Sequence, residues 1–250
     1  MVDAMVTDDG TAPAHPVRVL WAVPRSASTA FERMMIERGD HEVLDEPYSG
    51  AYYHGPERIS DRFPLSEPEA TIGTITDGVN TLADDRPVFV KDMAYHPADD
   101  LGALLDEPWQ WSFLIRDPRW SIPSMARIWP DLTVAEAGFT AVEQGVDLVI
   151  ASGAEPVIID SDELCREPEL QVATWCESMD LAPDPDALTW EAGMREEWER
   201  WQDWYGATSE STGFAPPREG EPPAVEGRVA ELVEASMPIY ERLRDLALTT

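Results

Sequence analysis

The chain has 250 residues, of which 43% are hydrophobic and 27% are charged, so it is long enough for one large domain or two small ones. The 49 acidic residues outnumber the 18 basic ones and give a formal net charge of −31, which argues against nucleic acid or an anionic membrane as a partner. No apolar run reaches the roughly 18–20 residues needed to span a bilayer, and the acidic first 16 residues lack the basic and apolar regions of a secretory signal. With only Cys165 and Cys176 as cysteines, we expect a cytoplasmic protein with free thiols.

Taken in chain order, short apolar runs alternate with helical patterns. The predicted strands cover 17–23, 41–44, 87–90, 110–115 and 156–159. The predicted helices cover about 28–38, 68–82, 98–105 (a short helix or turn), 118–128, 133–152, 161–178 and 225–247. A Trp-rich segment at 190–205 and a Pro/Gly/Ser-rich loop at 206–223 precede the last helix. This alternation predicts an α/β fold in three layers with a mostly parallel central sheet.

The predicted domain organisation is simple. Residues 1–16 are expected to form a flexible tail, and residues 17–250 a single domain. In open α/β sheets ligands bind at the carboxyl ends of the strands, so the residues directly after each strand are the candidates for function. These segments are 24–29, 45–48, 91–92, 116–118 and Asp160.

The loop after the first strand favours an anion. Arg25, Ser26, Ser28 and Thr29 precede or begin a helix, whose free N–H groups and dipole attract phosphate. The loop lacks GxxxxGK[ST], so magnesium-dependent hydrolysis of a nucleoside triphosphate is poorly supported. The structural alternative is an ordinary helix N-cap formed by Ser26 or Ser28.

A second anion-binding pattern follows the fourth strand. In FLIRDP the strand end presents Arg116, and Ser124 follows on the next helix. A guanidinium and a hydroxyl can together hold one phosphate. The structural alternative is a surface pair of Arg116 with Asp117 and a solvated serine.

These two motifs, PRSAST and FLIRDPxxxxxxS, together resemble the P-loop-type sulfotransferases that use 3′-phosphoadenosine 5′-phosphosulfate (PAPS) as co-substrate. The resemblance implies a P-loop-like sulfotransferase fold and no metal. It implies that the first loop binds the 5′-phosphosulfate and that an Arg and Ser pair binds the 3′-phosphate. A Ser-Thr-Gly-Phe segment after the Trp-rich stretch resembles a further part of bacterial and plant members. The donor-binding residues implied in this way are Arg25, Ser26, Ala27, Ser28, Thr29, Arg116, Ser124, Ser211, Thr212 and Gly213.

The chain also departs from this family. Ala27 stands where the family often has glycine, so we expect the turn to avoid positive φ there. Arg25 replaces the lysine of cytosolic members, and Met93 occupies the position of their catalytic histidine. The RKG nucleotide clamp near the C-terminus of those enzymes is not evident. A histidine mechanism is therefore not carried over directly.

Glu46 is the predicted general base, because some bacterial sulfotransferases use a glutamate in a similar place. His96, five residues after Lys91, is the alternative base, and the structural alternative for Glu46 is a solvated loop acid. Lys91 is the single lysine of the chain and ends a strand, which suits it to stabilise the leaving phosphate. Its structural alternative is a surface lysine beside Asp92.

The aromatic residues Trp198, Trp201, Trp204 and Tyr205 lie at near-helical spacing. Core packing is the default interpretation of such a pattern, and an aromatic wall for adenine or an acceptor is the alternative. The loop at 206–223 is a candidate to close over the site.

The sequence thus predicts a sulfotransferase that moves a sulfuryl group from PAPS to a hydroxyl of a small-molecule acceptor. Another P-loop transferase, such as a small-molecule kinase, and a non-catalytic nucleotide-binding protein are the alternatives. No nucleic acid or membrane partner is expected, and the oligomeric state, a homodimer included, stays open.

Overall fold

A computed structural model describes residues 12–195, 198, 201 and 204–248. Within these residues the central sheet is wholly parallel and has the strand order β2-β3-β1-β4-β5. The strands are β1 (Val17–Ala22), β2 (Glu42–Asp45), β3 (Val88–Met93), β4 (Gln110–Ile115) and β5 (Val157–Asp160). The predicted α/β class with a mostly parallel sheet is confirmed.

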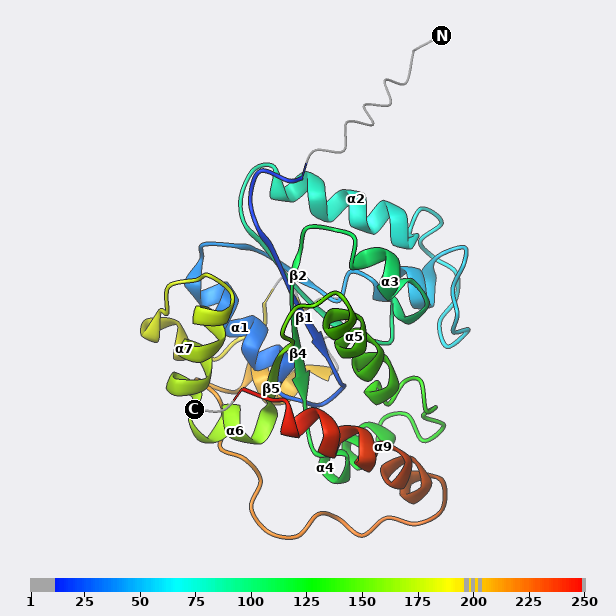
Figure 1. Cartoon of the computed structure of the whole chain (residues 1–250). Helices are drawn as coiled ribbons and strands as arrows, with labels where there is room; N and C mark the ends of the chain where they lie inside the picture. Colours follow the sequence, from blue (N-terminus) through cyan, green and yellow to red (C-terminus); the bar gives the residue numbers. More distant parts are fainter. Residues whose placement is uncertain (1–11, 196–197, 199–200, 202–203, 249–250) are drawn as a thin grey trace.

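Helices cover both faces of the sheet. They are α1 (Ser28–Arg38), α2 (Ile72–Ala83), α3 (Leu101–Leu104), α4 (Pro118–Ala126), α5 (Phe139–Ala151), α6 (Ser161–Arg166), α7 (Pro168–Ser178), α8 (Gly206–Ser209) and α9 (Gly227–Asp245). In Figure 1, α1 and α7 lie on one side of the strands and α5 and α9 on the other, which gives the three predicted layers.

The strands are buried on both faces, as parallel sheets between two helix layers require. Every residue of β1 and β3 is buried. The α5 layer approaches β4 closely at Gly145, where an added Cβ would lie 2.7 Å from the ring of Phe113. Both cysteines are free.

Most element bounds lie within a few residues of the prediction. The helix predicted over 133–152 begins only at Phe139, directly after Gly138, whose backbone is left-handed. Strand β3 continues through Lys91 to Met93, because it pairs with β1 as far as Ala22. The helix predicted over 161–178 is divided at Glu167, whose conformation is restricted by the following Pro168. The stretch between β2 and α2, for which neither a strand nor a helix is predicted before residue 68, contains a π-helical turn, Gly50–His54.

The strand order indicates where a ligand is expected to bind at the edge of the sheet. The chain leaves β1 for β2 and β3 on one side, and then crosses to β4 on the other, so the order reverses beside β1. The carboxyl ends of β1 and β4 lie at this switch point. In Figure 1 the extended segment before α9 runs below these strand ends.

Part of the predicted tail lies outside the described residues, namely 1–11. Of the described part, the His15 N–H donates to the carbonyl of Ala83.

None of the helices that the structure describes combines the length and the apolar character needed to cross a bilayer.

Candidate active site

The loop between β1 and α1 presents an uncapped helix N-terminus. Ala27 is the N-cap residue, and no side chain caps the helix, so the alternative of a Ser26 or Ser28 cap is wrong. The Ser26 hydroxyl instead donates to the Val23 carbonyl at 2.7 Å and holds the turn. The first N–H groups of α1 therefore stay available to an anion.

Three non-glycine residues near this crevice have left-handed backbones. Arg25, Ala27 and Glu46 have φ values of 63°, 67° and 49°. The expectation that Ala27 avoids positive φ is wrong: the turn keeps the left-handed conformation with a Cβ present. Such strain persists only where the surroundings fix it, and it concentrates at functional sites.

A cavity of about 270 Å³ opens at these strand ends. It is lined by ten of the thirteen residues at which the sequence places donor, base or leaving-group functions, either by resemblance or by position. These are Arg25, Ala27, Ser28, Thr29, Glu46, His96, Arg116, Ser124, Ser211 and Gly213. The structure thus brings together residues from five separate parts of the chain.

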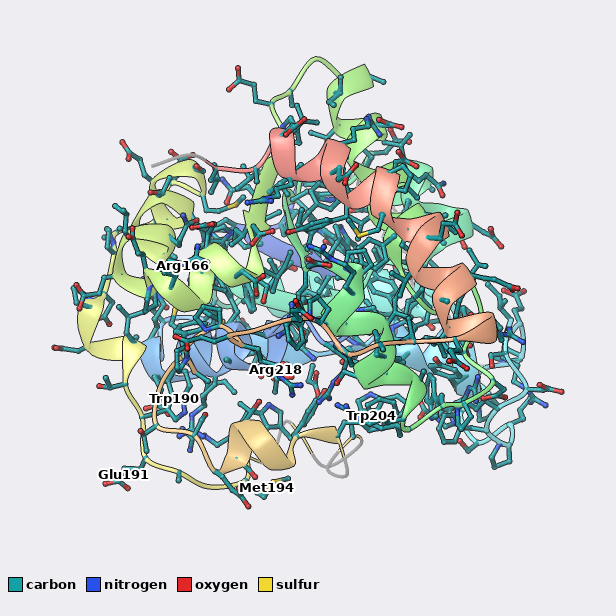
Figure 2. All side chains as sticks on the ribbon, turned by 90° about the horizontal axis from the view of Figure 1, so that it is seen from below. Arg166, Trp190, Glu191, Met194, Trp204 and Arg218 are labelled. Carbon is teal, nitrogen blue, oxygen red and sulfur yellow. The ribbon has the colours of Figure 1, made fainter. Side chains whose placement is uncertain are left out.

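One end of the cavity is cationic. Arg116 donates to the carbonyl of Arg25 at 2.7 Å, and Arg25 lies 3.4 Å from the Ser124 hydroxyl, to which Arg127 also donates. Arg218, from the loop before α9, lines the same cavity. Figure 2 shows Arg218 on the segment that crosses this face. Burial, and next the charges of these neighbouring arginines, lower the pKa of Arg25.

Among the residues that the structure describes, no carboxylate lies within ion-pair distance of Arg25, Arg116 or Arg218. The Arg116 Nε is buried and has no hydrogen-bond partner among the described residues. The nearby Asp162 acts on Arg116 only through its charge, which partly offsets the lowering of the Arg116 pKa by burial. This end of the cavity is built for an anion.

Lys91 lies behind the cavity rather than on its wall. Its ammonium is fully buried and pairs with Asp45, with Glu46 at 2.8 Å and with Glu32 at 3.1 Å. Burial lowers the pKa of Lys91, but the charges of the three carboxylates outweigh it and raise the pKa well above the ordinary value. The alternative of a surface lysine is wrong, and the ammonium acts on the site through Glu46.

Glu46 connects this buried cluster to the cavity. Its backbone N–H donates to the Lys91 carbonyl at 2.8 Å, and its carboxylate receives Lys91 on Oε1. The side chain also lines the cavity, so the alternative of a solvated loop acid is wrong. The Tyr205 hydroxyl lies 3.2 Å from the same oxygen and 2.8 Å from Asp45.

His96 forms a buried pair with Asp92. The ring Nδ1 lies 2.5 Å from the carboxylate, which also accepts the N–H groups of Tyr48 and Met93. The Asp92 acceptor fixes Nδ1 as a nitrogen that carries a proton. Nε2 is buried with no partner among the described residues, and His96 lines the cavity.

The Trp-rich segment supplies both core and wall. Trp198 is fully buried and donates to Glu32 at 2.9 Å. Trp201, Trp204 and Tyr205 line the cavity. Trp198 therefore belongs to the core, and the other three residues form part of the cavity wall.

The C-terminal motif is only partly at the cavity. Ser211 and Gly213 line it, whereas Thr212 does not belong to the lining and uses its carbonyl to accept the Trp190 N–H. Ser26 and Lys91 are likewise buried outside the lining. The sequence analysis did not single out Arg218 or Arg127 as site residues, because no motif distinguishes them. It placed Asp92 among the strand-end candidates without a role, and it assigned Tyr205 only to an aromatic stretch.

The comparisons with known proteins concern the family and the fold. A family model described as Sulfotransferase domain matches residues 17–247. Two Arabidopsis thaliana proteins, branched-chain-amino-acid aminotransferase-like proteins 2 and 1, are 30% and 28% identical over 90% of this chain. The chain spans only 40% and 41% of their lengths. The sulfotransferase domain of the Synechococcus PCC 7002 olefin synthase has the same fold, with a TM-score of 0.52 at 13% identity, covering 91% of this chain and 96% of that one.

Proposed function

Because the chain belongs to the sulfotransferase family, we propose that it transfers a sulfuryl group from PAPS to the hydroxyl of a small-molecule acceptor. The observation that carries this proposal is the set of arginines at one end of the cavity, without carboxylate partners among the described residues. In a chain of net charge −31, arginines that have no carboxylate partner among the described residues favour the binding of an external anion.

The residues at the cavity suit the two charged groups of the donor PAPS. The uncapped N–H groups of α1, with the hydroxyls of Ser28 and Thr29, suit the 5′-phosphosulfate. Arg116 and Ser124 suit the 3′-phosphate, since Arg116 Nε lacks a partner in the described part of the chain. No residue of this scheme needs a metal ion to complete its role.

Glu46 receives the proton of the acceptor hydroxyl in this scheme. The acceptor oxygen forms a bond to sulfur while the bond between sulfur and the 5′-phosphate oxygen breaks. The products are a sulfate ester, adenosine 3′,5′-bisphosphate and a proton on Glu46. Lys91 and Tyr205 position the Glu46 carboxylate, and they do not touch the reacting atoms.

The first experiment tests donor recognition by thermal unfolding. We expect adenosine 3′,5′-bisphosphate to raise the Tm more than the same concentration of ATP. Greater stabilisation by ATP, together with transfer of its terminal phosphate, would establish the kinase alternative and refute the proposal. A chain stabilised by adenosine 3′,5′-bisphosphate that transfers no sulfate to any alcohol or phenol would be a nucleotide-binding protein only.

The second experiment assigns the base. We expect Glu46→Gln to lower kcat by about 10²- to 10⁴-fold, because general base catalysis contributes about this much. Affinity for adenosine 3′,5′-bisphosphate should be unchanged. His96→Gln should have the smaller effect, and the opposite order of the two variants would assign the base to His96.

A further inference from the structure

The sheet places one carboxylate of α6 beside Arg116. Ile115 and Asp160 are paired, and they end the adjacent parallel strands β4 and β5. Arg116 and Ser161 therefore leave the sheet side by side. In Figure 1, α6 begins at this strand end. Its first turn faces the cationic end of the cavity, and Ser161 and Asp162 line the cavity together with Arg116.

Asp162 differs from its acidic neighbours because its carboxylate has no partner. Asp117 pairs with Arg119. The Asp160 carboxylate accepts the Tyr240 hydroxyl at 2.9 Å and the backbone N–H of Asp162 at 2.9 Å. Within the part of the chain that the structure describes, no group donates a hydrogen bond to the carboxylate of Asp162 or forms an ion pair with it. This half-buried side chain is therefore an acceptor without a donor.

The electrostatics of Asp162 agree with this description. Burial, and next the charge of Asp160, raise the pKa of Asp162, although the charge of Arg116 opposes them. Among the charges that act on Arg116, that of Asp162 has the largest effect, so the two side chains lie close together although they form no ion pair. A hydrogen-bond donor on a ligand would offset the cost of leaving this carboxylate partly desolvated.

A carboxylate beside a phosphate-binding arginine suits one part of the donor. In the proposed function Arg116 binds the 3′-phosphate, and the next carbon of the ribose carries the free 2′-hydroxyl. Dinucleotide-binding folds use the same two residue types on a ribose, a carboxylate for the free hydroxyl and an arginine for the phosphate. The amine of adenine lies farther from the 3′-phosphate, on the base, so the hydroxyl is the donor group that matches a carboxylate close to Arg116.

We propose that Asp162 is a specificity-determining residue that accepts a hydrogen bond from the ribose 2′-hydroxyl of the sulfuryl donor. The inference rests on the proposed function, because it requires the 3′-phosphate to lie on Arg116. The two side chains then distinguish which ribose oxygen carries the phosphate. A nucleotide with the phosphate on the 2′ oxygen would place it against the Asp162 carboxylate, and its free hydroxyl against the guanidinium.

The test compares three nucleotides by calorimetry on the full chain: adenosine 3′,5′-bisphosphate, its 2′-deoxy analogue and adenosine 2′,5′-bisphosphate. We expect the first to bind at least about tenfold more tightly than the 2′-deoxy analogue, which lacks a hydrogen bond to a charged group. It should also bind at least about tenfold more tightly than the 2′,5′ isomer, because that isomer brings two negative groups together. Equal binding of the first two nucleotides, or tighter binding of the isomer, would overturn the inference.

Asp162→Ala and Glu163→Ala form a matched pair of variants. Both remove one carboxylate from the first turn of α6, but Glu163 lies outside the cavity lining and pairs with Arg166. In Asp162→Ala the affinities for adenosine 3′,5′-bisphosphate and its 2′-deoxy analogue should differ by less than about threefold, since the hydrogen bond is absent for both. Glu163→Ala should keep the preference of the natural chain. A preference that persists in Asp162→Ala, or is lost equally in both variants, would overturn the inference.

The ratio of the two affinities isolates the hydroxyl group. Both ligands carry the same phosphates, so removing a negative charge near the site changes the two affinities alike. If Asp162→Ala strengthened the binding of both ligands by the same factor, Asp162 would act by charge repulsion alone and the inference would be wrong. The comparison of nucleotides in the natural chain does not depend on the folding of either variant.

Failure of the inference and failure of the proposed function are distinguishable. Binding of none of the three nucleotides would refute the proposed function and the inference with it. Binding of adenosine 3′,5′-bisphosphate without a preference over its 2′-deoxy analogue would refute the inference alone.

Discussion

Two groups of cations lie within one site, and they differ in whether the described residues supply their counter-charge. Lys91 is fully buried and contacts three carboxylates. Arg25, Arg116 and Arg218 line the cavity, and none of them reaches a carboxylate among the described residues. A cation that is paired internally contributes to folding, whereas one left without a carboxylate is available to a ligand.

The largest expected effect is on stability, from Lys91→Met. The substitution leaves three buried carboxylates without their shared cation, and removing one partner of a buried ion pair costs about 3–5 kcal/mol. Urea unfolding should show this loss in the free energy of unfolding. Arg116→Met is the matched control, and it should change the free energy of unfolding by less than about 1 kcal/mol. A similar loss in both variants would erase the distinction between the two groups.

The next effect concerns the affinity for the nucleotide, and the variant expected to show it is Arg116→Met. Arg116→Met should weaken binding of adenosine 3′,5′-bisphosphate roughly 10- to 100-fold, as hydrogen bonds to charged groups contribute about 1.5–3 kcal/mol. Calorimetry measures the change. Arg119→Met removes the neighbouring, exposed arginine that pairs with Asp117 outside the cavity lining, and it should leave the affinity unchanged. Equal losses in both variants would indicate a nonspecific charge effect.

Tyr205→Phe should have a smaller effect, on turnover. The hydroxyl contacts Asp45 and Glu46, and removing one such hydrogen bond costs about 1 kcal/mol, or roughly a fivefold decrease in kcat. Because the hydroxyl acts through Glu46, the pH profile of kcat should shift while the KM for the donor stays constant. A change in donor KM alone would place Tyr205 in donor binding instead.

The smallest expected effect is a change in the pH dependence of stability, from Glu32→Gln. Burial, and next the charge of Asp45, raise the pKa of Glu32 well above its ordinary value. A carboxyl group with a raised pKa in the folded state stabilises the fold fully below its unfolded pKa of about 4.3, and this stabilisation is lost as the pH rises through the folded-state pKa. The free energy of unfolding of the variant should therefore fall less than that of the natural chain between pH 5 and pH 8. Parallel curves would show that Glu32 does not titrate differently in the two states.

The sheet was predictable because its strands are short apolar runs, and strand ends in a parallel sheet meet at one edge. That rule placed Arg25, Glu46 and Arg116 together before any geometry was available. The sequence predicted Lys91 at the ligand site, whereas the structure places it in the interior behind the cavity. Strand β3 extends past Lys91, and the buried ammonium contacts Glu46 from behind the cavity wall.

The roles of other site residues could not be predicted from the sequence. The strand-end rule included Asp92, but its contact with His96 depends on a turn that returns the ring to it. Tyr205 contacts Asp45 because a segment far along the chain folds back onto the site. Arg218 belongs to a Pro-rich loop with no periodicity to orient it. The left-handed backbone at Ala27 is favoured by no side chain and is imposed by the turn around it.

The placement of three indoles on one cavity wall has a practical consequence. Trp129, Trp201 and Trp204 line the space that any ligand fills, and the carbonyl of Trp204 is a contact of Arg25. Filling that space replaces water around these rings, so the intrinsic ultraviolet emission of the unlabelled chain should change as each ligand arrives. Rapid-mixing fluorescence on this emission could then resolve which of the two ligands enters first.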